Sequence, residues 1–158
     1  MTKLSLPVAE IVRENMSVLM THAFSMGPLE ELFDKTFQGE WKQYQDTVFS
    51  LSEKRAEKAC IELAIFLRYL DDEEGLSKYF NKTESNIKFG SLHFSSGKEK
   101  ELKLRDVANK IIHARGFSWD VTQPMKPKLI CTSRESEKWS EARIDIVALS
   151  TVCGSLLG

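Results

Sequence analysis

Three polar residues between positions 102 and 116 have side chains that could do chemistry from one flank of a helix. Arg105, Asn109 and His113 follow one another at intervals of four residues, about one helical turn. A histidine can give or take a proton near neutral pH, and an arginine can hold a phosphate with two hydrogen bonds and stabilise developing negative charge. Together they form a minimal set for metal-independent RNA cleavage, with Asn109 as a positioning group.

These residues share a flank only if the segment is a helix, which its apolar residues predict. On a wheel of about 100° per residue they gather away from the polar flank: Leu104, Val107, Ala108, Ile111 and Ala114. Ser96 and Glu99 fit a capping box that would open the helix, and Gly116 is a typical C-terminal stop. We therefore expect a helix over residues 102–116. A simpler interpretation of the polar flank is that these residues only face solvent, as polar residues do on the exposed side of many helices.

The N-terminal residues predict further helices that would support this one. The apolar side chains of residues 7–24 have helical spacing, and Pro7 suits the first turn. Gly27-Pro28 should break the chain, and a short helix is expected over residues 29–37.

The most regular helix is expected in the middle of the chain. Ser50 and Glu53 fit a capping box, and the helix should run from there to about Leu70 as the central core helix. Residues 41–49 before it are ambiguous. The acidic residues 71–74 would lie at the C-terminal end of this helix, where negative charge interacts unfavourably with the helix dipole. We therefore expect that end of the helix to be exposed to solvent.

The second half of the chain predicts a small β-structure. Residues 76–80 fit a short helical turn, and residues 86–94 fit either two extended pieces or a loop. Residues 128–132 predict a strand, and the alternation over residues 139–146 predicts a second strand that completes a hairpin. Residues 147–157 predict an apolar helix. The expected fold class is mainly α: a helical bundle with a β-hairpin near the C-terminus, followed by a short closing helix.

The composition is that of one globular domain. The chain has 158 residues, of which 42% are hydrophobic and 28% charged, with a formal net charge of -1. We expect a single domain over residues 1–158. The near-zero net charge excludes a strong general attraction to nucleic acid or an acidic membrane, but a local basic patch is compatible with it.

The cysteines and the N-terminal residues indicate a compartment. Cys60, Cys131 and Cys153 are odd in number, far apart and in apolar contexts, so we expect buried thiols rather than a disulfide framework. The N-terminal sequence lacks the apolar region of a signal peptide, and no apolar run reaches the roughly 18–20 residues of a membrane span. The expected localisation is cytoplasmic, with no membrane partner.

Other groups of residues carry weaker signals. His22, His93 and His113 are too scattered for a metal motif, and the chain has no glycine-rich phosphate loop. No metal site and no cofactor is therefore expected. The aromatic residues within positions 41–49 could stack bases, although such a group also fits a core or an oligomer contact.

The stretch LRDVANKIIHAR resembles the late helix of HEPN domains, small all-helical bundles found in prokaryotic defence and toxin–antitoxin systems. The resemblance makes Arg105 the family arginine, Asp106 the adjoining polar residue and His113 the family histidine. It implies a metal-independent endoribonuclease whose site forms where two copies meet, hence a homodimer. Seven residues separate arginine and histidine here, against four to six in the family pattern, which rotates the two apart by roughly 80°. Asn109 is then the closer neighbour of His113, and Arg115 is a candidate substrate-binding cation.

Two hypotheses follow for function. The first is a HEPN-like domain of a defence or toxin–antitoxin type system that cleaves RNA, with Arg105, Asn109 and His113 as catalytic residues. The second is a non-enzymatic interaction module, such as an antitoxin, immunity protein or accessory subunit, with a cognate protein as partner. A His113 ring that opens to a cleft favours the first, and a ring that is buried and fully hydrogen-bonded favours the second.

Overall fold

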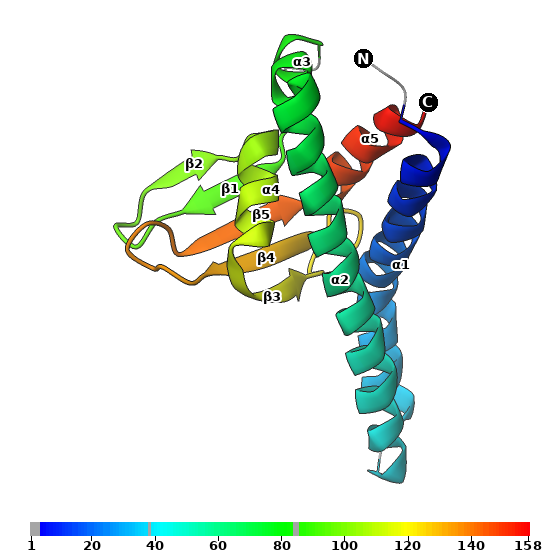
Figure 1. Cartoon of the computed structure of the whole chain (residues 1–158). Helices are drawn as coiled ribbons and strands as arrows, with labels where there is room; N and C mark the ends of the chain where they lie inside the picture. Colours follow the sequence, from blue (N-terminus) through cyan, green and yellow to red (C-terminus); the bar gives the residue numbers. More distant parts are fainter. Residues whose placement is uncertain (1–3, 38, 84–85) are drawn as a thin grey trace.

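The computed structural model describes residues 4–37, 39–83 and 86–158, with only the backbone described for Leu6, Trp41, Tyr44, Lys82 and Thr83. The part of the chain that it describes is mainly helical, and a sheet precedes the closing helix (Figure 1). The helices are α1 (Leu6–Thr36), α2 (Lys42–Glu74), α3 (Leu76–Thr83), α4 (Leu104–Ile112) and α5 (Ile146–Leu157), with a 3-10 turn over Gly39–Trp41. The strands are β1 (Gly90–His93), β2 (Glu99–Glu101), β3 (Ala114–Asp120), β4 (Lys128–Ser133) and β5 (Glu141–Asp145). The predicted fold class, including the closing helix, is confirmed.

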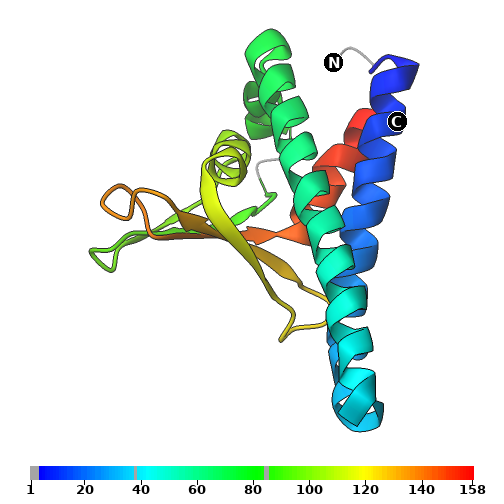
Figure 2. The ribbon, with the colours of Figure 1, turned by 60° about the horizontal axis from the view of Figure 1, so that its bottom comes forward.

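The two long helices, α1 and α2, form an antiparallel pair whose joined ends extend past the sheet (Figure 2). The predicted break at Gly27-Pro28 is wrong, because α1 continues through Pro28. A proline inside a helix loses one backbone hydrogen bond, and packing beyond it must offset that loss. Phe33 provides such packing: it is 3% exposed, and its ring centroid lies 5.1 Å from that of Phe49 in α2.

The predicted start of the central helix at Ser50 is also wrong. The helix α2 already begins at Lys42, so Ser50 is an exposed residue inside it rather than a capping residue. The ambiguous residues 42–49 form the first turns of α2, which packs on α1; the contact of Phe49 with Phe33 in the second half of α1 is one that no local pattern reveals. The side chains of Trp41 and Tyr44, which belong to the aromatic group of that segment, lie outside the described residues.

The sheet is antiparallel and has the strand order β2-β1-β5-β4-β3. The predicted hairpin is confirmed as β4 and β5, which pair from Lys128↔Asp145 to Thr132↔Glu141. Strand β1 lies within residues 86–94, for which extended pieces were one of the two alternatives, whereas β2 and β3 were not predicted as strands. Gly90 shows why β1 fits beside β5: a Cβ atom at this position would lie 1.9 Å from the carbonyl oxygen of Arg143.

Helix α4 is shorter at both ends than predicted. Ser96 lies in the turn between β1 and β2, and the helix begins at Leu104, where the Asp106 carboxylate accepts a hydrogen bond from the Lys103 backbone N–H at 3.2 Å. The helix ends at Ile112 and not at Gly116, because the chain enters β3 at Ala114 and pairs there with β4. His113 is therefore the C-cap residue between a helix and a strand.

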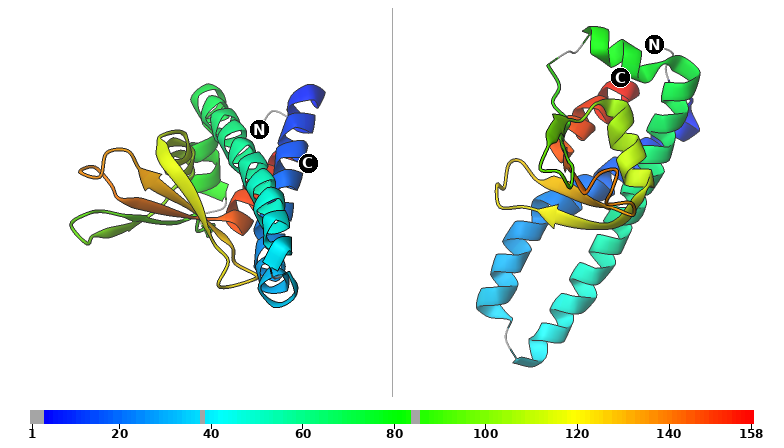
Figure 3. Two further views of the ribbon diagram at one scale, coloured as in Figure 1. Left: turned by 90° about the horizontal axis from the view of Figure 1, so that it is seen from below. Right: turned by 90° about the vertical axis from the view of Figure 1, so that its left-hand side faces the viewer.

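The core lies between the sheet and the helices. Helix α4 covers the sheet face that carries the buried residues Leu92, Leu129, Ala142 and Ile144, and α2 packs on α4 (Figure 3). The closing helix α5 packs on α1 and is capped by the Asp145 carboxylate, which accepts a hydrogen bond from the Ala148 N–H at 2.9 Å. None of the described helices combines the length and apolar character needed to cross a membrane.

The three cysteines are buried and unpaired, as predicted. Burial raises the pKa of the Cys153 thiol to about 12, and it raises the pKa values of Cys60 and Cys131 as well. The thiols are therefore protonated parts of the core, and they have none of the thiolate character that reactive cysteines need.

Candidate functional site

Arg105, in the first turn of α4, is bound by carboxylates at the end of α2. Its Nη1 atom donates to Asp71 Oδ2 and lies 2.9 Å from Asp72 Oδ1. The side chain of Asp71 is only 6% exposed, and its other oxygen accepts the Ser77 backbone N–H at 2.7 Å at the start of α3. Burial raises the pKa of Asp71, but the hydrogen bonds from Ser77 and Arg105 outweigh it and hold the pKa below its ordinary value.

Asn109, one turn further along α4, is also engaged within the fold. Its Oδ1 atom accepts a hydrogen bond from Arg68 Nη1, and Arg68 Nε lies 3.0 Å from Asp72 Oδ2. Arg68, Asp71, Asp72, Arg105 and Asn109 thus form one connected set of contacts, which we call the Arg105 network. It fixes the polar flank of α4 to the C-terminal end of α2.

His113 has a different environment at the other end of α4. Its side chain is exposed and lines a depression of about 470 Å³, which we call the His113 pocket. The walls come from α2, α4, the end of β4 and the turn before β5: Arg68, Asn109, Lys110, His113, Ser133, Arg134, Glu135, Lys138 and Trp139. Four of these residues are lysine or arginine and one is an acid, so the pocket has an excess of positive charge.

The cations of the His113 pocket differ in how they are held. Lys110 Nζ lies 4.7 Å from the centre of the buried Trp139 ring, a distance at which a cation is attracted to an aromatic face. Burial, with the nearby Lys100, lowers the pKa of Lys110 against the opposing effect of Asp106. Neither Lys110 nor Arg134 has a carboxylate within ion-pair distance among the described residues.

The single acid of the pocket is already neutralised. Glu135 forms an ion pair with Lys138, and this contact holds the pKa of the Glu135 carboxyl below its ordinary value, with a smaller contribution from His113. Arg134 is oriented by its backbone contact, in which Nε donates to the Ala114 carbonyl oxygen at 3.3 Å. The positive charge of Lys110 and Arg134 is therefore available to an anion.

The structure brings together only part of the predicted site. His113 and Asn109 line the same pocket, whereas Arg105 lines a separate depression with the acids at the end of α2. Arg115 is exposed on β3, outside the residues that line the His113 pocket.

Sequence reasoning missed most of the pocket. Lys110 lies three residues before His113 on the same helix, which is a signal that could have been used. Arg134, Lys138 and Trp139 come from the turn between the hairpin strands, and only the fold places that turn beside the end of α4.

The pocket has the chemistry of an anion site with a proton donor or acceptor beside it. Over the described residues, no group of three or more histidine, cysteine or acidic side chains could hold a metal ion. Comparison of the chain with protein-family models, with curated proteins and with solved structures found no match. The resemblance to HEPN domains rests on residues 104–115, which form α4, its C-cap residue His113 and the beginning of β3.

Proposed function

We propose that the chain binds the phosphate backbone of RNA in the His113 pocket and cleaves it without a metal ion, as a HEPN-like endoribonuclease of a prokaryotic defence or toxin–antitoxin type system. One observation carries the proposal: His113 is exposed in a pocket where Lys110 and Arg134 have no acidic partner among the described residues. An exposed histidine beside unneutralised cations can bind a phosphate and exchange a proton with it.

The proposed reaction is an attack of the ribose 2′-hydroxyl on the adjacent phosphorus. One His113 side chain accepts the 2′-hydroxyl proton as the new P–O bond forms, and the bond to the 5′-oxygen breaks. That oxygen leaves with a proton from solvent or from a protonated histidine, which gives a 2′,3′-cyclic phosphate and a 5′-hydroxyl. Lys110 and Arg134 stabilise the negative charge that develops on the phosphate oxygens.

The proposal changes the role that the resemblance gives to Arg105. Two carboxylates already neutralise Arg105, and a phosphate would have to displace them. We therefore assign the phosphate contact to Lys110 and Arg134 and treat the Arg105 network as structural. The fold also differs from a bundle of helices alone, since α4 packs on a five-stranded sheet. The resemblance supports the proposal through His113 only.

The test is RNA cleavage by purified protein in EDTA. We expect cleavage of single-stranded RNA, none of DNA of the same sequence, since DNA lacks the 2′-hydroxyl, and loss of cleavage in His113→Ala. The matched control is His93→Ala, which removes a histidine from β1, outside the pocket. Cleavage that survives in His113→Ala, or a wild-type protein that cuts no RNA, would contradict the proposal.

The Arg105 network favours a second candidate function. Arg105 Nη1 and Asn109 Oδ1 are both engaged in contacts within the fold, as expected of a non-enzymatic interaction module with a cognate protein partner. In that case the His113 pocket would bind an acidic surface of the partner. Absence of RNA cleavage, together with a cognate-protein affinity that falls in Lys110→Ala, would favour this function. Both candidates place the chain in the cytoplasm, where unpaired thiols persist.

A further inference from the structure

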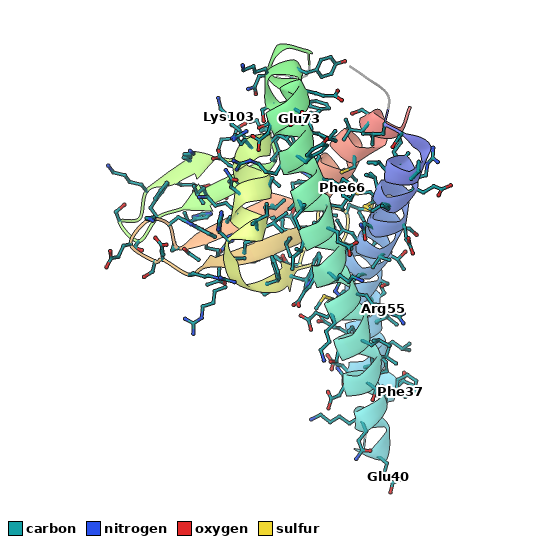
Figure 4. The ribbon with its side chains drawn as sticks, in the orientation of Figure 1. Phe37, Glu40, Arg55, Phe66, Glu73 and Lys103 are labelled. Atoms are coloured by element: carbon teal, nitrogen blue, oxygen red, sulfur yellow. The ribbon has the colours of Figure 1, made fainter. Side chains whose placement is uncertain are left out.

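One side of α2 is exposed and carries large apolar side chains. Ile61, Ile65 and Tyr69 follow one another at intervals of four residues and are 39%, 54% and 60% exposed. Their spacing places them in one stripe along the helix. Figure 4 shows α2 in front of the sheet and α1, with the labelled side chains of Arg55, Phe66 and Glu73 along its length.

The charges on both sides of this stripe have opposite signs. Lys54 and Lys58 precede it and are exposed, and Glu73 follows it and is exposed. On a helical wheel these three residues and the stripe lie within an arc of about 120°. We call these six residues, Lys54, Lys58, Ile61, Ile65, Tyr69 and Glu73, the α2 outer face.

We infer that the α2 outer face binds a second copy of this chain, with the two α2 helices antiparallel about a twofold axis near Ile65. In this arrangement residue i lies opposite residue 130−i of the copy, because a twofold axis makes each contact reciprocal. Ile65 then meets the same residue of the copy, and Ile61 meets Tyr69.

Charge complementarity selects the antiparallel second copy as the occupant. The same pairing places the basic residue Lys58 opposite Asp72 of the copy, whose carboxylate also contacts Arg68 and Arg105, and one position from Glu73, which has no ion pair among the described residues; each contact is made twice. A parallel arrangement would place like charges together at both ends. Lys58 is free to make this contact: its side chain is 77% exposed, and its ion pair with Glu62 is long, at 3.7 Å. The resemblance to HEPN domains already implies a homodimer. The inference adds the surface through which the dimer forms, and that surface is argued from α2 alone, so a failure of the RNA-cleavage test would not contradict it.

The first test is the mass of the protein in solution by size-exclusion chromatography with light scattering. We expect twice the chain mass of 18.0 kDa for the wild type. Ile65→Glu should give a monomer, with dimer affinity reduced by more than about a hundredfold, because two carboxylates would meet in an apolar contact. Leu32→Glu, at a 46% exposed position of α1, is the matched control and should stay dimeric.

The second test separates the charge pairs from folding effects. Lys58→Glu and Glu73→Lys should each weaken the dimer by roughly two- to thirtyfold, since each exposed pair is made twice. The double variant restores the opposite signs and should recover most of the wild-type affinity. If the double variant loses as much dimerisation free energy as the two single variants together, the antiparallel pairing is overturned.

The third test uses cysteine cross-linking, because a residue on a twofold axis faces its own copy. Ile65→Cys should form a disulfide-linked dimer under mild oxidation, and Leu32→Cys should stay largely uncross-linked. The native thiols are buried with raised pKa values and do not compete. A monomeric wild type, a dimeric Ile65→Glu variant or equal cross-linking of the two cysteine variants would overturn the proposal, and a monomer would leave the face to a different partner.

Discussion

The two ends of helix α4 differ although the same polar flank runs along both. At the first end, Arg105 meets two carboxylates of α2, so its charge is neutralised within the fold. At the second end, His113 is exposed beside Lys110 and Arg134, for which no described carboxylate is an ion-pair partner. The two ends lie within one short helix and have residues of similar types.

The difference shows that residue type and spacing do not distinguish a structural polar residue from a functional one. What distinguishes them is the charge that other elements bring to each residue. The acidic end of α2 neutralises Arg105, whereas the turn before β5 adds Arg134 and Lys138 near His113. Variants at each end of α4 test whether the two ends are separate in function as well as in structure.

The largest expected effect is on the rate of RNA cleavage, which should depend on one end of α4 and not on the other. His113→Ala should reduce RNA cleavage by about a hundredfold or more, the usual contribution of a general acid or base. Arg105→Ala should leave the cleavage rate of the folded fraction nearly unchanged, because Arg105 lies outside the His113 pocket. Single-turnover cleavage assays measure both. Equal losses in the two variants would mean that the two ends act as one site.

The next effect concerns the stability of the Arg105 network. Asp71→Ala removes an acceptor for both Arg105 and the Ser77 N–H, so it should lower the free energy of unfolding by about 2 kcal/mol. The thermal midpoint should fall by roughly 4–8 °C for a domain of this size. RNA affinity at a temperature where the variant is folded should not change. Calorimetry and a binding titration check the two halves of this prediction.

Acidification should reproduce part of that loss in the wild type. The pKa of Asp71 in the folded protein lies below its ordinary value of 3.8. Its stabilising effect is therefore present above that value and is lost as the pH falls through the folded-state pKa. Asp71→Asn should show a shallower decline of the thermal midpoint in this range. A decline as steep as that of the wild type would assign the acid sensitivity to other carboxyl groups.

A smaller effect should mark the His113 pocket. Lys110→Ala should weaken RNA binding and reduce the slope of log affinity against log salt by about 0.7, the value for one contact to single-stranded nucleic acid. Arg115→Ala, exposed on β3 outside the pocket, is the matched control and should retain the wild-type slope. An equal loss in Arg115→Ala would extend the binding surface along β3. Fluorescence titrations at several salt concentrations provide the measurement.

The smallest effect concerns a histidine that contrasts with His113 in its surroundings. His22 is 3% exposed, its Nδ1 atom lies 2.8 Å from Ser52 Oγ, and its ring contacts that of Trp119. Burial lowers the pKa of His22, against the smaller raising effect of Glu53. The unfolded chain then binds more protons, so stability should fall as the pH drops below the ordinary value of 6.5. His22→Gln should flatten this decline in thermal melts between about pH 7.5 and 5.5, and an unchanged slope would exclude His22 as its cause.

Several parts of the fold were predictable from local patterns. The period-2 alternation found β5, the apolar run found α5, and the helical spacing found the buried side of α2. Those patterns indicate which side of a segment is buried, and they depend only on the spacing of apolar residues within that segment. The same applies to the burial of Cys60, Cys131 and Cys153.

The errors occurred where a distant segment outweighed a local signal. Pro28 predicts a helix end, but packing of Phe33 on α2 keeps α1 intact. Gly116 predicts the end of a helix, but pairing of Ala114 with Ser133 turns the chain into β3 earlier. Each case sets one local preference against a long-range contact.

The candidate site divides in the same way. Local sequence patterns alone establish that α4 has a core face and a polar flank with Arg105, Asn109 and His113, because helical periodicity sorts side chains by their position along one segment. The neutralisation of Arg105 and the basic surroundings of His113 become visible only in the folded chain. This is because the charge around a residue is a sum over every element that packs near it, and most of those elements are distant in the chain.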